Sequence, residues 1–322
     1  MEPSAKIVIS ASRRTDIPAF YMQWMMEQIE KGVFEVVNPY NRRVTLVPAT
    51  PDKVHTIVFW SKNFGPFIKG GFGKLLQKEG YHLFFNFTIN SNSPFLEPNV
   101  PPLEERLEQL DYLCSRFDST TVNWRFDPLC FYTINNGRIY DNLDDFPYIA
   151  KRAAQSGIQR CITSFMDHYP KIQKRTASIN GLSFFDPPDE KKKEILLNME
   201  KALRAKKIRL QTCCEKKLIE ALPEYSTITK SACIPNDFLE KLFGGNLSLK
   251  CDKGQRIKDG CGCMVSVDIG SYHLHPCWHN CLFCYANPCS RTLKYPAQVG
   301  TQALKPEART LIPIVNSTNL SK

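Results

Sequence analysis

The segment MVSVDIGSYHLHPCWHNCLFCYA, residues 264–286, joins a strand pattern directly to a loop with three closely spaced cysteines. The apolar and β-branched residues of MVSVDIGSY (264–272) predict a β-strand. Cys277, Cys281 and Cys284 follow with the spacing C-x3-C-x2-C, which lets three thiolates surround one corner of a metal cluster. A [4Fe–4S] cluster with only three protein ligands keeps one iron open for a substrate or cofactor, and this spacing favours such a site.

Zinc is the alternative metal for this loop, because zinc sites often use pairs of C-x2-C cysteines. Cys281 and Cys284 would then form half of a site that Cys261 and Cys263, or His279, complete. The spacing alone leaves this alternative open.

Six earlier segments carry short apolar or β-branched runs that predict strands. They are KIVIS (6–10), TIVFW (56–60), HLFFNFTI (82–89), TTVNWRF (120–126), RCITSF (160–165) and KIRLQTC (207–213). Helical patterns lie between several of them, at 21–32, 101–113 and 189–207. Strands that alternate with helices predict an α/β fold with a parallel sheet or barrel.

Polar residues follow most of these strands. They are Arg13, Arg14 and Asp16 after the first strand, Lys62 and Asn63 after the second, Glu97 beyond the third, Arg125 and Asp127 after the fourth, and Asp167 and His168 after the fifth. The carboxyl ends of the strands of a parallel barrel open on one face, where active sites lie. We therefore expect a polar mouth there, with Arg13, Asp16, Lys62, Glu97, Arg125, Asp127 and Asp167 as candidate catalytic residues.

Composition places the chain among cytosolic proteins. The 322 residues contain no apolar run long enough for a membrane helix, and the start MEPSAK lacks the features of a signal peptide. We therefore expect a cytoplasmic protein with no membrane partner. The formal net charge of +10 leaves an anionic partner such as nucleic acid open, although the lysines are spread along the chain.

Thirteen cysteines in a reducing compartment are more typical of metal ligands or catalytic groups than of disulfides. Cys213, Cys233, Cys261 and Cys263 are the preferred ligands of a second, closed site for zinc or a [4Fe–4S] cluster. Cys214 and Cys251 are further candidates, and a mixture of buried, unligated cysteines is the alternative. Cys114, Cys130 and Cys161 are expected in the core.

These patterns divide the chain into three parts. Residues 1–213 form the main part of an α/β barrel, and 214–263 form a Cys-rich metal-binding insertion with one short helix near DFLEKLF. Residues 264–322 supply the last strand, the cluster loop and a proline-containing tail.

Cys277, Cys281 and Cys284, followed by Tyr285 and Ala286, resemble the cluster loop of the radical S-adenosylmethionine (SAM) superfamily, most closely its spore photoproduct lyase-like branch. "RRTD", "FWSKN" and "FLEPNVPPLEERLEQLDYL" are similar to that branch too. Across almost the whole chain, "ISASRRTDIPAFY", "VFWSKN", "WRFDP", "CGC..S.DIG.Y" and the cysteine loop resemble the uncharacterised domain of unknown function 1848 family.

The resemblance implies a circularly permuted, partial TIM-like radical SAM barrel, because the cluster loop of the superfamily usually follows the first strand and here follows the last. It implies that a reduced [4Fe–4S] cluster cleaves SAM to a radical that attacks the substrate. Arg14, Tyr285 and Asn287 are the candidate contacts to the cofactor. A flavodoxin- or ferredoxin-type donor would supply the electron, and the substrate is open, nucleic acid included. The competing hypothesis is a non-catalytic nucleic-acid-binding protein stapled by zinc or iron–sulfur.

Overall fold

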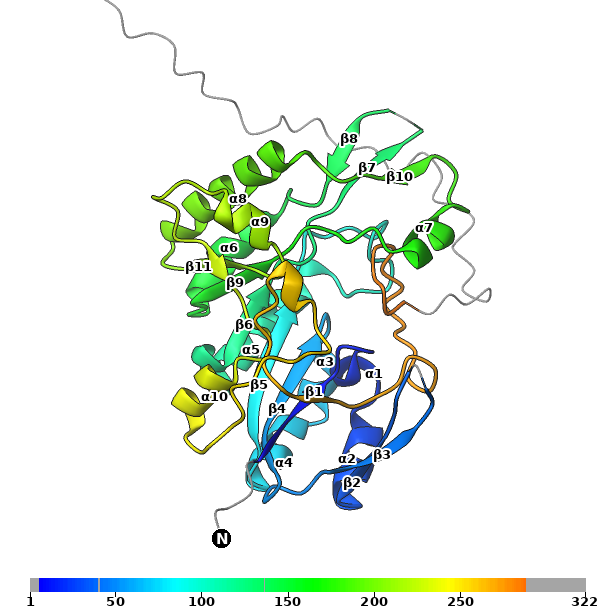
Figure 1. The fold of residues 1–322 in the computed structure, drawn as a ribbon, viewed down its shortest axis with the longest axis vertical. Coiled ribbons are helices and arrows are strands. Elements are labelled where there is room, and N and C mark those ends of the chain that lie inside the picture. Colours follow the sequence, from blue (N-terminus) through cyan, green and yellow to red (C-terminus); the bar gives the residue numbers. More distant parts are fainter. Residues whose placement is uncertain (1–5, 40, 136, 288–322) are drawn as a thin grey trace, which may run out of the picture. The chain divides into compact units, whose positions relative to one another are not determined.

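The β-branched and aromatic runs form one eight-stranded sheet in the computed structural model, which describes residues 6–39, 41–135 and 137–287 (Figure 1). In spatial order its strands are β12 (Thr229–Lys230), β11 (Arg209–Thr212), β9 (Arg160–Thr163), β6 (Val122–Arg125), β5 (His82–Thr88), β4 (Val54–Ser61), β1 (Ile7–Ala11) and β13 (Val267–Asp268). Every neighbouring pair is parallel, so the predicted parallel α/β sheet is confirmed. Within the described residues β12 and β13 are the two edges, and the sheet does not close into a barrel.

Helices connect most of these strands. They are α1 (Ile17–Phe20), α2 (Met22–Glu30), α3 (Gly65–Lys69), α4 (Phe72–Lys78), α5 (Leu103–Phe117), α6 (Phe146–Gln155), α7 (Pro170–Thr176), α8 (Asp189–Arg204), α9 (Lys216–Glu220) and α10 (Asn236–Phe243), with 3-10 turns η1 (Ser119–Thr121) and η2 (Ile257–Asp259). The predicted helices at 21–32, 101–113 and 189–207 are confirmed as α2, α5 and α8. In the described residues, no helix combines the length and the apolar character that crossing a bilayer requires.

Two small antiparallel sheets lie beside the main one. A hairpin joins β2 (Val33–Val37) to β3 (Val44–Pro48), and β7 (Phe131–Ile134) lies between β8 (Ile139–Asp141) and β10 (Leu182–Phe184).

Both faces of the parallel sheet are buried, which explains why its strands read as nearly continuous apolar runs. The side chains of Ile57 and Phe85 belong to the main hydrophobic core, to which α5 and α6 also contribute side chains. Val58 and Phe84, the alternate residues of the same strands, pack instead with Leu239 of α10. A helix from the Cys-rich region therefore covers part of the second face.

Residues 214–263 contribute more regular structure than their sequence predicts. The helix near DFLEKLF is confirmed as α10, but α9 and β12 are additional. β12 has only two residues, both exposed, so no apolar pattern marks it. It nevertheless extends the main sheet by pairing in parallel with β11.

The last predicted strand is present but short. β13 lies parallel to β1, with Ile9 opposite Val267 and Ser10 opposite Asp268, as the strand pattern of 264–272 predicts. It ends after two residues because Gly270 adopts the left-handed conformation, at φ 81°. The predicted tail beyond residue 287 lies outside the described residues.

Candidate active site

The carboxyl ends of the parallel strands surround a cavity of about 720 Å3. Because parallel strands end at one edge, residues far apart in the sequence meet here. Its lining includes eight of the predicted site residues, namely Arg13, Arg14, Asp16, Lys62, Arg125, Asp127, Asp167 and Tyr285. It also includes the predicted metal ligands Cys213, Cys233, Cys261, Cys263, Cys277, Cys281 and Cys284. Glu97 and Asn287 contact residues of the lining.

The three-cysteine loop is turned and held by its own polar groups. Asn280 takes a left-handed conformation, at φ 56°, which turns the chain between the first cysteine, Cys277, and the second, Cys281. The Asn287 side-chain amide donates to Asn280 Oδ1 at 2.9 Å and to the Cys281 carbonyl at 3.0 Å. The N–H of Ala286 donates to Cys284 Sγ at 3.3 Å. Asn287 thus positions the loop, and its contact with a cofactor stays a prediction.

Arg175 of α7 holds the same loop from outside. Its Nη2 donates to the carbonyl oxygens of Cys281 at 3.4 Å and Cys284 at 3.1 Å, and also to that of Leu282. The side chain is buried. Sequence reasoning missed Arg175, because it lies outside the strand ends and belongs to no motif; the basic residues beside it gave no signal that this one turns inward.

Replacing Arg175 with lysine should weaken metal binding by the three-cysteine loop. Arg175 Nη2 alone makes the three contacts, and lysine keeps the charge but has a shorter side chain that would not place a donor at the same point. Outer residues that orient ligands commonly contribute 10–100-fold to metal affinity, so we expect a loss of about that size. Iron content after anaerobic reconstitution at limiting iron measures it. Lys174→Arg, one residue away and exposed, is the matched control. Equal iron content in the Arg175→Lys and Lys174→Arg variants would contradict the role of Arg175 in holding the loop.

Asp16 joins three segments of the site. As the N-cap of α1 it accepts from the Ala19 N–H at 3.0 Å, and it also accepts from the Lys62 N–H at 2.9 Å. The Ser61 hydroxyl reaches both carboxylate oxygens, at 2.8 and 2.9 Å. His279 Nε2 lies 2.8 Å from Asp16 Oδ2. These bonds occupy the carboxylate, so Asp16 tethers the cysteine loop to β1 and β4.

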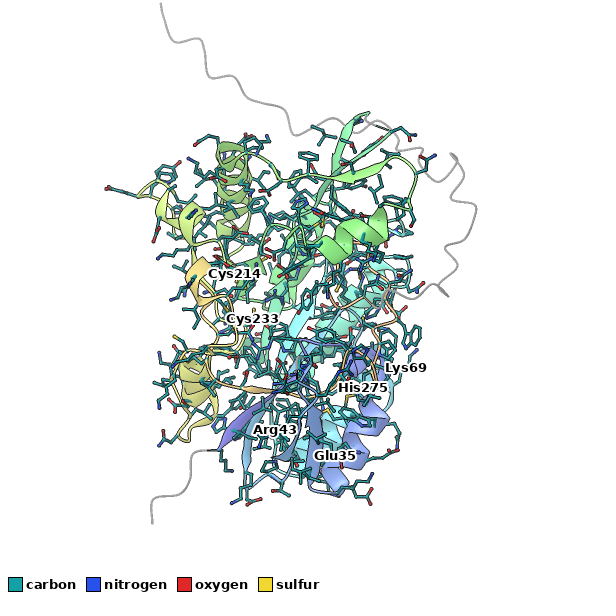
Figure 2. All side chains as sticks on the ribbon, turned by 45° about the vertical axis from the view of Figure 1, so that its right-hand side comes forward. Glu35, Arg43, Lys69, Cys214, Cys233 and His275 are labelled. Atoms are coloured by element: carbon teal, nitrogen blue, oxygen red, sulfur yellow. The ribbon has the colours of Figure 1, made fainter. Side chains whose placement is uncertain are left out.

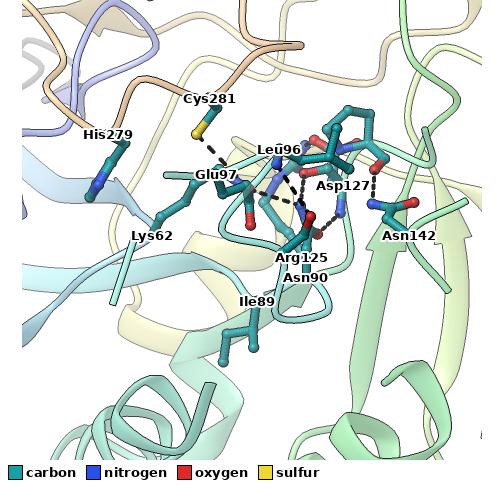
Figure 3. Close-up of polar contacts among 12 residues, drawn as sticks. Lys62, Ile89, Asn90, Leu96, Glu97, Arg125, Asp127, Asn142, His279 and Cys281 are labelled. Atoms are coloured by element: carbon teal, nitrogen blue, oxygen red, sulfur yellow. Dashed lines mark hydrogen bonds and ion pairs between the residues drawn. The ribbon is translucent and has the colours of Figure 1, made fainter. Parts of the chain in front are cut away.

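Lys62 and Glu97 form a buried ion pair beside Cys281 (Figure 3). Lys62 Nζ lies 2.5 Å from Glu97 Oε1, and Cys281 Sγ lies 4.0 Å from the same oxygen. Burial is the largest single influence and lowers the pKa of Lys62, but the charge and hydrogen bond of Glu97 together with the charges of Cys281 and Cys284 outweigh it, so the pKa is raised. The ammonium group therefore stays charged next to the cysteine loop at neutral pH.

Replacing Glu97 with glutamine should lower the free energy of unfolding by about 3–5 kcal/mol, because it leaves the Lys62 charge buried without its partner. Urea denaturation measures the loss. Combining Glu97→Gln with Lys62→Met removes the orphaned charge and should restore most of the stability. Glu194→Gln breaks the exposed pair with Lys191 and should cost less than about 1 kcal/mol. A double variant no more stable than Glu97→Gln alone would refute the explanation.

The two arginines after β1 bind backbone and carboxylates around β13. The Arg13 guanidinium contacts Asp268 at 2.9 Å and Asp252 at 3.3 Å. Arg14 Nη1 donates to the carbonyls of Val37 and Gly270, at 3.2 and 3.3 Å. The Tyr285 hydroxyl donates to the Arg13 carbonyl at 2.8 Å, which fastens the end of the cysteine loop to the end of β1.

The remaining predicted residues lie beside the second cysteine group. Arg125 Nη1 donates to Cys233 Sγ at 2.5 Å, and Nη2 contacts Asp127 at 2.6 Å. Asp127 also accepts from the Ser164 hydroxyl, and Asp167 pairs with Arg256 at 2.6 Å. Neither Ser164 nor Arg256 was predicted for the site. Ser164 sits at a strand end, where the polar-mouth pattern could have found it, whereas Arg256 comes from an irregular loop.

The cysteines form two separate groups. Cys233, Cys261 and Cys263 cluster with Cys213 and Cys214, whereas Cys281 and Cys284 pack with Leu96 and its neighbours. This separation does not favour a single metal site that combines Cys281 and Cys284 with Cys261 and Cys263. Both ring nitrogens of His279 face oxygens, Asp16 Oδ2 at 2.8 Å and the Asn99 carbonyl at 3.3 Å. As the side chains stand in the described residues, no three His, Cys, Asp or Glu groups are arranged around a common metal position.

Comparison with known proteins gives a family but no activity. The model of a family described as a domain of unknown function, DUF1848, matches residues 8–286. No curated protein matches the chain.

Proposed function

This chain belongs to the DUF1848 family, and from its site we propose that it is a radical SAM enzyme. Cys277, Cys281 and Cys284 would hold a [4Fe–4S] cluster whose fourth iron binds SAM. One observation carries the proposal: the C-x3-C-x2-C loop opens into the cavity where the polar strand ends meet. A cluster there would stand beside the space in which a substrate can bind.

The groups in and around the cysteine loop suit a [4Fe–4S] cluster. Three thiols lie on one short turn, and a backbone N–H already points at Cys284 Sγ, as is common around cluster ligands. Lys62 places a positive charge near Cys281 and offsets part of the negative charge that thiolates bring. Arg175 and Asn287 fix the carbonyls of the loop, so the thiols keep their direction.

When bound, the cluster would supply the electron that cleaves SAM to methionine and a 5′-deoxyadenosyl group. The chain's own residues would place and enclose the reactants. Tyr285 and Tyr272 line the cavity, and Lys171 Nζ lies 5.4 and 5.5 Å from the centres of their rings. Each ring has an aromatic face on which an adenine could stack.

We also propose that the parallel sheet is a circularly permuted, partial form of the TIM-like radical SAM barrel. The support is the position of β13 next to β1, since it puts the cluster loop beside the first strand of the chain. A low-potential flavodoxin- or ferredoxin-type protein would deliver the electron.

The test is reductive cleavage of SAM. Protein reconstituted anaerobically with iron and sulfide is mixed with dithionite and SAM, and 5′-deoxyadenosine is measured by mass spectrometry. We expect its formation to depend on protein and reductant. A folded protein that carries the cluster yet forms none with dithionite or with a stronger titanium reductant would overturn the proposal. Stoichiometric zinc without iron, together with tight nucleic-acid binding, would favour the non-catalytic alternative.

A further inference from the structure

We propose that Cys213, Cys233, Cys261 and Cys263 bind a second metal centre, a four-thiolate site on the wall of the same cavity. This site shares no residue with the three-cysteine loop, so it does not rest on the proposed SAM chemistry. Four thiolates suit zinc or a [4Fe–4S] cluster, and both metals use such closed sites to stabilise a fold.

Cysteines from three distant segments of the chain converge at this site. Cys213 follows β11, Cys233 precedes α10, and Cys261 and Cys263 precede β13. Cys233, Cys261 and Cys263 are nearly completely buried, and together with Cys213 and Cys214 they form a cluster of their own. Cys214 and Cys233 are seen close together in Figure 2. All five are free thiols.

Backbone hydrogen bonds hold these three segments together. The Ser231 N–H donates to the Thr212 carbonyl at 2.8 Å, beside Cys213. The Gly262 N–H donates to the Ser231 carbonyl at 3.2 Å, and the Met264 N–H donates to the Ile234 carbonyl at 3.0 Å. The sulfur-bearing loops are therefore joined on both sides of Cys233, before any ligand binds.

Glycine between two of the cysteines makes this approach possible. A Cβ at Gly262 would lie 2.6 Å from the Ser231 carbonyl oxygen, which is too close for any side chain. Gly262 thus lets the Cys261–Cys263 loop lie directly against the segment that carries Cys233. This close approach places Cys261 and Cys263 in the same cluster as Cys233.

A buried positive charge lies beside the cysteine cluster. Arg125 is buried, and its Nη1 donates to Cys233 Sγ at 2.5 Å. A guanidinium N–H is a charge-assisted donor that suits a thiolate better than a neutral thiol. Four thiolates and a dipositive ion or cluster leave a net negative charge, which Arg125 can partly offset. Arg125 acts here as a positioning residue.

Cys214 is the fifth cysteine of this cluster, and we assign it a different role. Cys214 has φ 63°, a left-handed conformation that costs a non-glycine residue energy, and its Sγ lies 3.6 Å from Cys213 Sγ. Four ligands complete a thiolate site, so we assign Cys214 as a neighbour of the centre and not as a ligand. Cys251, the other candidate from the sequence, is exposed.

Metal analysis of a full-length variant that lacks the first site tests the proposal. In Cys277→Ala/Cys281→Ala/Cys284→Ala, purified anaerobically, we expect about one zinc or about four irons per chain to remain. Iron–sulfur absorption and the electron paramagnetic resonance of the reduced protein distinguish the two metals. Adding Cys261→Ser and Cys263→Ser should remove this metal, whereas adding Cys214→Ser or Cys251→Ser should leave it.

Folding is followed by circular dichroism, because loss of a structural metal can unfold the chain. If the five-cysteine variant does not fold, chelator treatment of the three-cysteine variant replaces it, and a fall in the unfolding temperature that added metal reverses supports the site. A folded three-cysteine variant without metal, before and after reconstitution with zinc or with iron and sulfide, overturns the proposal. So does metal that survives Cys261→Ser/Cys263→Ser.

Discussion

Alanine in place of Cys277, Cys281 or Cys284 should lower the yield of 5′-deoxyadenosine by well over 100-fold in each single variant. Residues that only orient metal ligands contribute about 10–100-fold to metal affinity or activity, and removing a ligand itself should cost more. With two cysteines the loop can no longer hold a cluster that keeps one iron open. The measurement is 5′-deoxyadenosine formed per chain under dithionite, alongside the iron content of each variant.

Cys130→Ala is the matched control, since Cys130 is buried in the same apolar cluster as Cys281 but stands outside the C-x3-C-x2-C motif. Its variant should retain SAM cleavage. If Cys130→Ala and Cys281→Ala lose activity equally, the effect reflects packing around the loop and not ligation.

Alanine in place of Asp16 should lower the free energy of unfolding by about 3–5 kcal/mol, or prevent folding. The change leaves two backbone N–H groups and the Ser61 hydroxyl without their acceptor, and each buried orphan costs about 1–3 kcal/mol. It also removes the partner of His279, a residue of the cysteine loop. Urea denaturation of the apoprotein measures the loss separately from any metal.

Asp118→Ala offers the comparison. Asp118 also caps a short helical turn, by accepting from the Thr120 N–H at 2.8 Å, but it is exposed, and its loss should cost only about 1 kcal/mol. Similar losses in the two variants would show that Asp16 acts as an ordinary cap, without the wider network described here.

The strand and helix patterns were sufficient for the central part of the fold. β1, β4, β5 and β6 each contain four or more consecutive buried residues, and such runs are visible in a sequence. The edge strands of the sheet were harder to predict from the sequence. β12 and β13 have two residues each, so their pairing depends on neighbours that the local sequence does not reveal. The antiparallel strands β2, β3, β7, β8 and β10 were not predicted either, and they pair outside the main sheet.

For the site, the polar residues at strand ends were predictable because parallel topology brings such positions together. The interactions that those side chains make there were not predictable. The carboxylate of Asp16 accepts hydrogen bonds from backbone N–H groups and lies beside His279, contacts that the sequence does not reveal, and its catalytic role stays a prediction. Arg175 was not predicted at all, since its role depends on the carbonyl groups of a loop about a hundred residues later. The residue types in a sequence do not show which backbone carbonyl groups will accept a hydrogen bond.

The pairing of β1 with β13 also sets the order in which the molecule can be assembled during synthesis. Arg13 and Asp268, which flank this pairing, are 255 residues apart. At ~5–20 residues per second, a ribosome needs roughly 10–50 s to travel between them. During that interval the outer edge of β1 has no partner strand, and an unpaired edge invites pairing with another chain. A nascent chain therefore has reason to be shielded until β13 emerges, and the cysteine loop can receive metal only afterwards.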